Sequence, residues 1–318
     1  MLPYLIRRLL ATIPVLIVVG LFTFFLLRLT PGDPAAVIAG NESTHEEYLQ
    51  IRERLGLDDP IYIQLGKWSV RILQGDFGTS IRSGKPVFDL IKTRIGPSVS
   101  LTIATEIIAV LVAIPLGVLA AWKANSLIDR AVMVFAAIGF SIPIFWLGFI
   151  LIWVFGLWAF GLDNPILPVA GYARIDDGLL DYLRHLALPA LSLGLVVIAL
   201  VARMTRASVL EVLKEDYVRT ARAKGLTEKT VLIRHALRSA SLPILTIIGL
   251  GLAGLLSGAV VTESVFAIPG LGRLAVDAIA TRDYPIIQAL IILIGTFYVF
   301  INLAVDIAYA VLDPRIRY

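Results

Sequence analysis

The segment "DYVRTARAKGLTEK", residues 216–229, is polar and basic, yet it stands between two long apolar runs. Just before this segment and within its first half, apolar residues recur at three- and four-residue steps, which predicts one helix over 206–224. The residues of this stripe are Val209, Leu210, Leu213, Tyr217 and Ala221. Gly225 is typical of a helix end, and Thr227 is the expected N-cap of a second short helix reaching about Leu237. The segment therefore predicts a helix–Gly–helix elbow.

The rest of the chain is mostly apolar. Of its 318 residues 58% are hydrophobic and 16% charged, with a mean hydropathy of +0.85, whereas soluble domains carry about a quarter charged residues. Six runs are long enough to cross a bilayer core of about 30 Å. They are Leu9–Leu29, Ser98–Trp122, Ala131–Phe160, Leu186–Met204, Pro243–Val265 and Ile286–Leu312. We predict an all-α polytopic membrane protein with six transmembrane helices, the third kinked or tilted at Pro143.

The first run resembles a secretory signal peptide in its basic start and apolar middle. It has 21 residues, however, and is followed by "TPGDP" at 30–34 rather than by a small-residue cleavage site. A retained first helix is therefore the better interpretation.

Lysine and arginine in short flanks predict the orientation, because they favour the cytoplasmic side. Nine basic residues lie between 203 and 238, and further ones lie near both ends of the chain. We expect both termini and the elbow, residues 206–242, to be cytoplasmic. Residues 31–96 then form an extracytoplasmic insertion between helices 1 and 2, with helical patterns near Thr44–Leu55 and Ile61–Leu73. The expected domains are 1–30, 31–96 and 97–318.

No catalytic or metal-binding motif is recognisable, so the chain is not expected to be an enzyme. The nearest approach to the phosphate-binding pattern G-x-x-x-x-G-K-[ST] is "GTSIRSGKP", residues 78–86, which has five residues between the glycines and a proline after the lysine. The three histidines are isolated, and the absence of cysteine excludes disulfide and thiolate chemistry. The energy for any transport must come from a partner or from an ion gradient.

Residue patterns alone leave three interpretations of the elbow open. It is an amphipathic helix on the membrane surface, a long loop, or a docking helix that carries force from a soluble partner to the spans. A secondary transporter would instead use ionisable residues inside its spans, for which Glu106, Glu263 and Asp306 qualify. Snorkelling or a structural bond to a neighbouring helix also explains these three. No inverted internal symmetry supports the secondary transporter.

The stretch "YVRTARAKGLTEKTVLIRHALRSASLP", residues 217–243, resembles the coupling-helix segment, or "EAA" loop, of ABC-importer permeases of the dipeptide and oligopeptide type. Arg219-Thr220-Ala221 replaces the general acidic residue and two alanines, and Leu242-Pro243 lies farther from Gly225 than usual. Three further stretches are similar to the same family. They are "RRLLATIPVLIVVGLFTFFLLRLTPGDPA" at 7–35, "TESVFAIPGLGRLAVDAIATRDYPIIQA" at 262–289 and "DPRIR" at 313–317.

This resemblance implies a permease subunit in the bacterial inner membrane, forming half of a path for peptides. It implies four kinds of partner: a second homologous permease, two cytoplasmic ATPases that hold ATP and magnesium, an extracytoplasmic substrate-binding protein and the lipid bilayer. No cofactor or nucleic acid is expected on this chain. The implied ATPase-coupling residues are Tyr217, Ala221, Lys224, Gly225 and Leu226. Glutathione, nickel chelates and oligosaccharides remain alternative substrates, because selection is expected on the binding protein.

The fifth span places Gly251, Gly254 and Gly258 on one face. Such small residues allow close helix packing within a subunit, or give a translocation path a smooth lining. The residues after them would form the outer mouth, as a gate or as contacts with the binding protein. These candidates are Glu263, Phe266, Pro269, Gly270, Gly272 and Arg273. A plain turn is the alternative reading of Pro269-Gly270.

Overall fold

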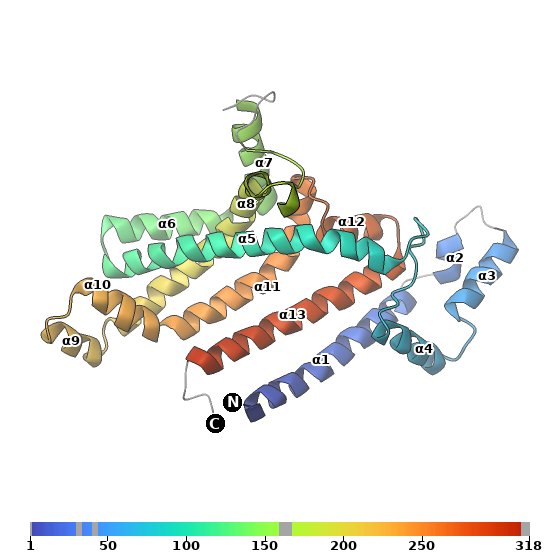
Figure 1. The fold of residues 1–318 in the computed structure, drawn as a ribbon, viewed down its shortest axis with the longest axis horizontal. Helices are drawn as coiled ribbons and strands as arrows, with labels where there is room; N and C mark the ends of the chain where they lie inside the picture. Colours follow the sequence, from blue (N-terminus) through green and yellow to red (C-terminus); the bar gives the residue numbers. More distant parts are fainter. Residues whose placement is uncertain (1, 30–33, 40–43, 159–166, 313–318) are drawn as a thin grey trace. The chain divides into compact units, whose positions relative to one another are not determined.

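The computed structural model describes residues 2–29, 34–39, 44–158 and 167–312 (Figure 1). These residues are almost entirely helical and contain no strand, only an isolated antiparallel bridge between Thr79 and Pro86. The chain divides into two compact units. The larger unit is residues 1–5, 96–273 and 301–318, and the smaller unit is residues 6–95 and 274–300. The loop "TPGDP", apart from Pro34, and the terminal "DPRIR" lie outside the described residues.

The larger unit is a helical bundle with an elbow between two of its long helices. Its elements are α5 (Val87–Trp122, from Gly96 on), α6 (Leu127–Ser141), α7 (Ile144–Ile152), the π-helix η1 (Trp153–Trp158), the 3₁₀ turn η2 (Ile175–Asp177), α8 (Leu179–Val212), α9 (Asp216–Ala223), α10 (Glu228–Thr230), the π-helix η3 (Val231–Leu237), α11 (Ser241–Val265) and the last part of α13 (Tyr284–Leu312).

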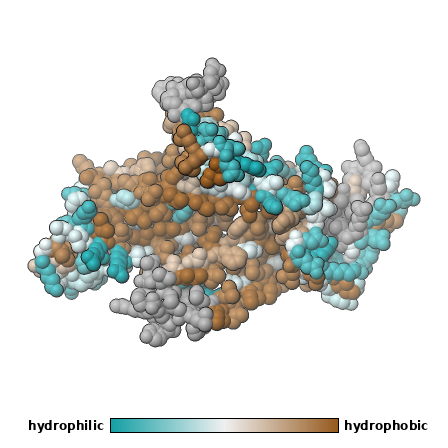
Figure 2. Space-filling view, in the orientation of Figure 1, coloured by the Kyte–Doolittle hydropathy of each residue, from teal (hydrophilic) through white to brown (hydrophobic). Residues whose placement is uncertain are grey.

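Helix α8 is the centre of this unit, because α6, α7 and α11 all pack on it. Its buried residues Leu188, Leu193 and Val201 belong to the main apolar core, together with residues of α5 and α11. Gly117 of α5 lies so close to α8 that an added Cβ atom would stand 2.5 Å from the Cβ of Thr205. In Figure 2 the surface over α5 and α6 is apolar, and hydrophilic residues gather over α9 and α10. This pattern is typical of a bundle solvated by lipid.

Among the described residues five helices are long and apolar enough to span a membrane, which confirms five of the six predicted spans as continuous helices. The third predicted span is different, because α6 and the segment from Ile144 to Gly156 meet at 99°. Pro143 stands at this break with an extended backbone, since proline cannot donate the hydrogen bond that would continue α6. The predicted end of this third span, Phe160, lies outside the described residues.

The fourth span also differs from the prediction, because α8 runs from Leu179 to Val212 rather than from 186 to 204. Pro189 is therefore inside the helix instead of at its start, and it is buried. Neighbouring packing compensates for the hydrogen bond that proline removes, as is common in membrane helices.

The smaller unit holds the helical insertion. Its elements are α1 (Leu2–Leu29, from Ile6 on), α2 (Pro34–Ala39), α3 (His45–Leu55), α4 (Ile61–Leu73), the start of α5, α12 (Leu271–Ala280, from Leu274 on) and most of α13. The helices predicted near 44–55 and 61–73 are confirmed as α3 and α4. Trp68 of α4 packs on Phe24 of α1, with ring centroids 5.5 Å apart. Gln288 of α13 donates a hydrogen bond of 3.0 Å to the Thr23 carbonyl, which ties α13 to α1.

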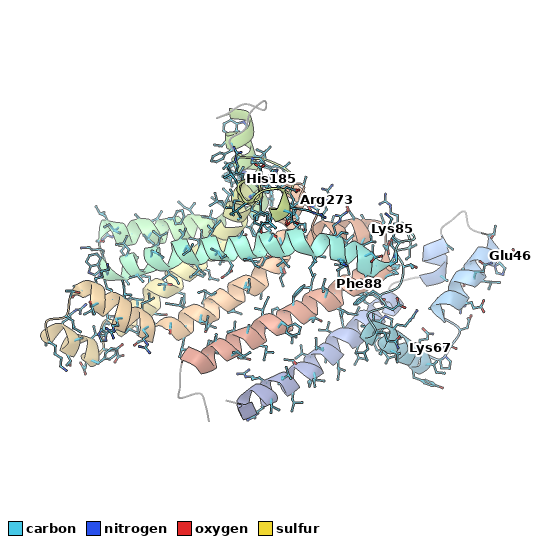
Figure 3. All side chains as sticks on the ribbon, in the orientation of Figure 1. Glu46, Lys67, Lys85, Phe88, His185 and Arg273 are labelled. Carbon is cyan, nitrogen blue, oxygen red and sulfur yellow. The ribbon has the colours of Figure 1, made fainter. Side chains whose placement is uncertain are left out.

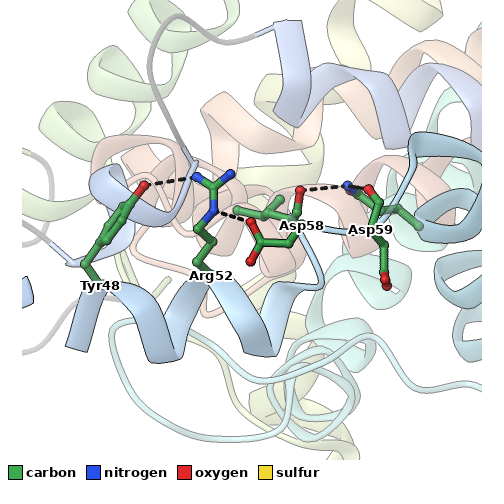
Figure 4. Close-up of polar contacts among 6 residues, drawn as sticks. Tyr48, Arg52, Asp58 and Asp59 are labelled. Carbon is green, nitrogen blue, oxygen red and sulfur yellow. Dashed lines mark hydrogen bonds and ion pairs between the residues drawn. The ribbon is translucent and has the colours of Figure 1, made fainter. Parts of the chain in front are cut away.

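Polar contacts fix the turns of this unit. Arg52 of α3 donates to Asp58 at 2.6 Å and to the Tyr48 hydroxyl at 3.0 Å (Figure 4), and these bonds raise the pKa of the Arg52 guanidinium. The loop between α4 and α5 is anchored on the turn before α13, since Ser80 donates to the buried carboxylate of Asp283 at 2.6 Å. Between α4, this loop and the start of α13 lies a cavity of about 1010 Å³.

Candidate functional site

The elbow is built from local signals in the sequence, with one difference from the prediction. The single helix expected over 206–224 is wrong, because α8 ends at Val212 and α9 begins at Asp216 with Glu215 extended at its N-cap. Gly225 ends the elbow's first arm at φ +80°, a conformation that other residues adopt only with strain. Thr227 caps the second arm as predicted, accepting a hydrogen bond from the Thr230 amide, and the arm runs through Leu237.

The break before α9 changes which residues face inward. Val218 and Ala221 are buried against Val231 of the second arm, together with Val212 and Leu213. Tyr217, predicted on the apolar stripe, is instead exposed, and its hydroxyl donates to Ser239 at 2.8 Å. The elbow therefore has a small core of its own. Of the five candidate coupling residues, Ala221 lies in this core, whereas Tyr217, Lys224, Gly225 and Leu226 are on the surface.

Several contacts hold the arms of the elbow to each other and to the bundle. Arg222 of α9 pairs with Glu228 of α10 at 2.9 Å across the turn at Gly225. A second apolar cluster joins the elbow to three helices at once, because Ala236 of η3 packs with Ala121 of α5, Val209 of α8 and Ile244 of α11. The second arm of the elbow is therefore packed directly on three long helices of the bundle.

Sequence reasoning missed an ion pair near the end of α8, where the segment predicted as the elbow begins. Arg206 of α8 donates two hydrogen bonds to the buried carboxylate of Asp129 on α6, through Nε and, at 2.7 Å, through Nη2. The Asn125 amide donates to the same carboxylate at 2.9 Å, and Ser126 caps α6. The Ser-x-x-Asp spacing at 126–129 was a visible capping signal. The pairing with Arg206, 77 residues away, had no signal in the sequence.

At the far end of α11 a buried carboxylate organises the candidate mouth. Glu263 has no exposed surface and accepts hydrogen bonds from Ser98 of α5 at 2.5 Å and from the Arg273 amide at 3.0 Å. Ser98 in turn accepts from the Leu271 amide at 2.7 Å. Gly270 holds this carboxylate so closely that an added Cβ atom would lie 2.2 Å from its carbon. We call Glu263, Ser98, Gly270, Leu271 and Arg273 the carboxylate cradle.

The other mouth candidates differ in position. Phe266 is buried, and its ring packs close to Gly148 of α7. A Cβ atom added to Gly148 would lie 3.2 Å from this ring. Pro269 is exposed, and Gly272 approaches Val260 of α11. Arg273 bonds to the cradle through its backbone, while the residue is exposed (Figure 3). The segment 266–273 is therefore a folded connection held by Glu263.

The three glycines of α11 do not share one environment. Added Cβ atoms on Gly251 and Gly258 would meet Val197 at 3.1 Å and Leu193 at 2.7 Å, both on α8. These two glycines serve helix packing within the chain. Gly254 is exposed, with open space where a side chain would be. It is the one of the three that is available to line a path.

Two further candidate charges lie on α5 and α13. Both carboxylate oxygens of Glu106, on α5, are buried without a hydrogen-bond partner among the described residues. Asp306 is half-buried on α13. Within the described ranges no group of three or more His, Cys, Asp and Glu residues is arranged to hold a metal ion.

Comparison with known proteins identifies the family. Residues 113–318 match the family described as "Binding-protein-dependent transport system inner membrane component", and residues 1–102 match its N-terminal counterpart. The chain is 50% identical to a probable peptide ABC transporter permease protein, y4tP, of Sinorhizobium fredii, over 99% of each chain. It is 42% identical to the dipeptide transport system permease protein DppB of Alkalihalophilus pseudofirmus, over the full length of both.

A third relative, the glutathione transport system permease protein GsiC of Escherichia coli K12, is 44% identical over the full length of both chains. Among solved structures, a chain of the MetNI methionine ABC transporter in an inward-facing conformation has a similar fold. The TM-score is 0.58 at 17% identity, over 70% of this chain and 96% of that one. By the two family matches and these full-length relatives, the chain belongs to the family of inner-membrane components of binding-protein-dependent transport systems.

Proposed function

We propose that this chain forms half of the path by which an ATP-driven importer moves peptides across the bacterial inner membrane. The full-length similarity to permeases named for peptides, dipeptides and glutathione carries this proposal. Glutathione is itself a small peptide, so these names share one substrate class. Nickel chelates and oligosaccharides are less well supported, and an ion-gradient mechanism has no support from the family.

The elbow is the proposed coupling element. Its exposed residues Tyr217, Lys224, Gly225 and Leu226 would enter a groove on an ATPase, and its packed core would keep them in a fixed position. Ala221 contributes by packing under this surface. The elbow joins α8 and α11 directly, so a movement of the ATPase would rotate both helices. The basic residues around it support a cytoplasmic location for the elbow and both termini.

The carboxylate cradle is the proposed gate support at the outer end of α11. Because Glu263 fastens the segment from Phe266 to Arg273 to α5, movement of α11 relative to α5 would open or close this connection. Gly254 would face the path shared with a second permease. A surface without charge suits peptides, whose side chains vary while their backbone stays constant.

The proposal implies further subunits: the second permease, two ATPases that hold ATP and magnesium, and an extracytoplasmic binding protein. To test it, the chain is reconstituted in liposomes with the second permease, the ATPases and the binding protein of its transporter, and uptake of labelled dipeptide is measured with and without ATP. ATP-dependent uptake that also needs the binding protein is expected. Uptake by the chain alone along a proton gradient would contradict the proposal.

A further inference from the structure

We propose that α4 lies in the surface of the bilayer and binds membrane lipid through one apolar face. This inference rests on the membrane spans of the chain and not on the transported solute. None of the residues of α4 is buried. Its apolar side chains are open to the surroundings instead: Tyr62 is 71% exposed, Val70 53% and Leu73 87%.

Most of the exposed apolar residues of α4 lie on one side, and Ile61, which is also exposed, lies outside it. Successive residues of an α-helix are about 100° apart around its axis. On this wheel Tyr62, Ile63, Gly66, Val70 and Leu73 fall within an arc of about 100°, and all five are exposed. This side will be called the apolar face of α4. In water alone such a face would stay uncovered, at a cost that grows with its area.

One flank of α4, next to the apolar face, is polar. Lys67 pairs with Asp59 at 2.6 Å, and Gln64 donates to the carbonyls of Leu57 and Asp59 at 3.2 and 2.8 Å. Arg71 follows one turn after Lys67, whose position Figure 3 shows. Basic residues thus border the apolar face on this flank, which will be called the polar side. An apolar face bordered by basic residues is typical of helices that lie in the plane of a membrane surface.

The contact with α1 sets the level at which α4 lies. Trp68, on the arc between the polar side and the apolar face, packs on Phe24. Phe24 is two residues from Leu26, where the apolar span of α1 ends. Figure 1 shows α4 crossing this end of α1 rather than continuing along it. The apolar face therefore adjoins the boundary of the hydrocarbon region, with the polar side turned to the headgroups and water.

The neighbouring cavity does not account for the apolar face. Val70 and Gly66 line it, but Tyr62, Ile63 and Leu73 do not. Lipid is favoured over a protein partner because Trp68 packs α4 at the end of the membrane span of α1, on which Leu21 and Phe22 are also exposed. A tyrosine at one end of the face is typical of the interface, where its hydroxyl reaches water.

The sequence contains no cysteine, so single reporter sites can be introduced without removing any native residue. Tyr62→Cys, Leu73→Cys and, as the matched control on the same helix, Arg71→Cys are labelled with an environment-sensitive fluorophore. Each full-length variant is placed, with its partner subunits, in nanodiscs of phosphatidylcholine and phosphatidylglycerol. Quenching is then compared between nitroxides on the lipid acyl chains and iodide in the buffer.

We expect blue-shifted emission and strong quenching by the lipid nitroxide at positions 62 and 73, and quenching by iodide at position 71. Equal iodide quenching at all three positions would overturn the proposal. Labels at 62 and 73 that are open to iodide until the binding protein is added would also overturn it, because the face would then be a protein-docking surface.

Discussion

Replacing Gly270 by alanine tests the carboxylate cradle directly. The new Cβ atom would lie 2.2 Å from the carboxylate carbon and one oxygen of Glu263, and 2.4 Å from the other oxygen. Ordinary contact begins near 3.4 Å, so the carboxylate or the loop must move by about 1 Å. Glu263 is fully buried, and its carboxylate accepts hydrogen bonds from Ser98 and the Arg273 amide, so a shift of the carboxylate or the loop disturbs these bonds.

The size of the effect follows from the bonds that the shift breaks. Hydrogen bonds to charged groups contribute about 1.5–3 kcal/mol each. Losing those from Ser98 and the Arg273 amide therefore costs about 3–6 kcal/mol, and about 1–3 kcal/mol remains as overpacking strain even if the loop relaxes. We expect Gly270→Ala to lower the midpoint of thermal unfolding of the assembled complex and to reduce peptide uptake.

Gly254→Ala is the matched control, since it adds the same methyl group to α11 where nothing lies within 4 Å. Alanine favours a helix over glycine by about 0.5–1 kcal/mol, so the unfolding midpoint of this control should not fall below that of the wild type. The reasoning is refuted if Gly270→Ala unfolds at the same temperature as Gly254→Ala. Such a result would mean that Glu263 is not held by close approach of the loop.

Three further substitutions test the elbow and its supports. Gly225→Val forces a β-branched residue to φ +80°, at a cost of about 1–2 kcal/mol. Uptake and stimulated ATP hydrolysis should fall while membrane insertion is unchanged. Gly225→Asn should have a milder effect, because asparagine tolerates this conformation. Ala221→Glu buries a carboxylate between Val218 and Val231, so the ATPase should no longer co-purify with the permease; normal co-purification would contradict the packed elbow core. Asp129→Asn removes the charge facing Arg206 and should lower uptake per ATP hydrolysed, whereas Glu228→Gln in the exposed pair with Arg222 should change this ratio little.

Local signals predicted the parts of the elbow that depend on single residues. Gly225 and Thr227 were correctly placed because a left-handed helix end and an N-cap each have a short-range chemical cause. The break at 213–215 was missed because the apolar spacing continues across it. Once α9 restarts at Asp216, the inward position moves from Tyr217 to Val218, so a periodicity argument that ignores the break selects the wrong neighbour.

Long-range pairing explains the other differences. The sequence indicates that an acidic residue near a span end needs a partner, but it does not indicate that the partner of Glu263 is Ser98, 165 residues earlier. Pro143 was recognised as a point of weakness, whereas the 99° change of direction depends on what α7 packs against on α8 and α11. Tertiary contacts of this kind have no local signature.

The elbow and the carboxylate cradle lie at the two ends of helix α11. Helix α11 begins four residues after the second arm of the elbow and runs unbroken from Ser241 to Val265, a length of about 37 Å at 1.5 Å per residue. Its single proline, Pro243, lies in the first turn, where it does not interrupt hydrogen bonding. Gly251 and Gly258 bring it close to α8, so the two helices that leave the elbow are packed on each other. In the proposed mechanism a rigid α11 would therefore carry a displacement of the elbow to Glu263 without any flexible linkage between the proposed coupling element and the proposed gate support.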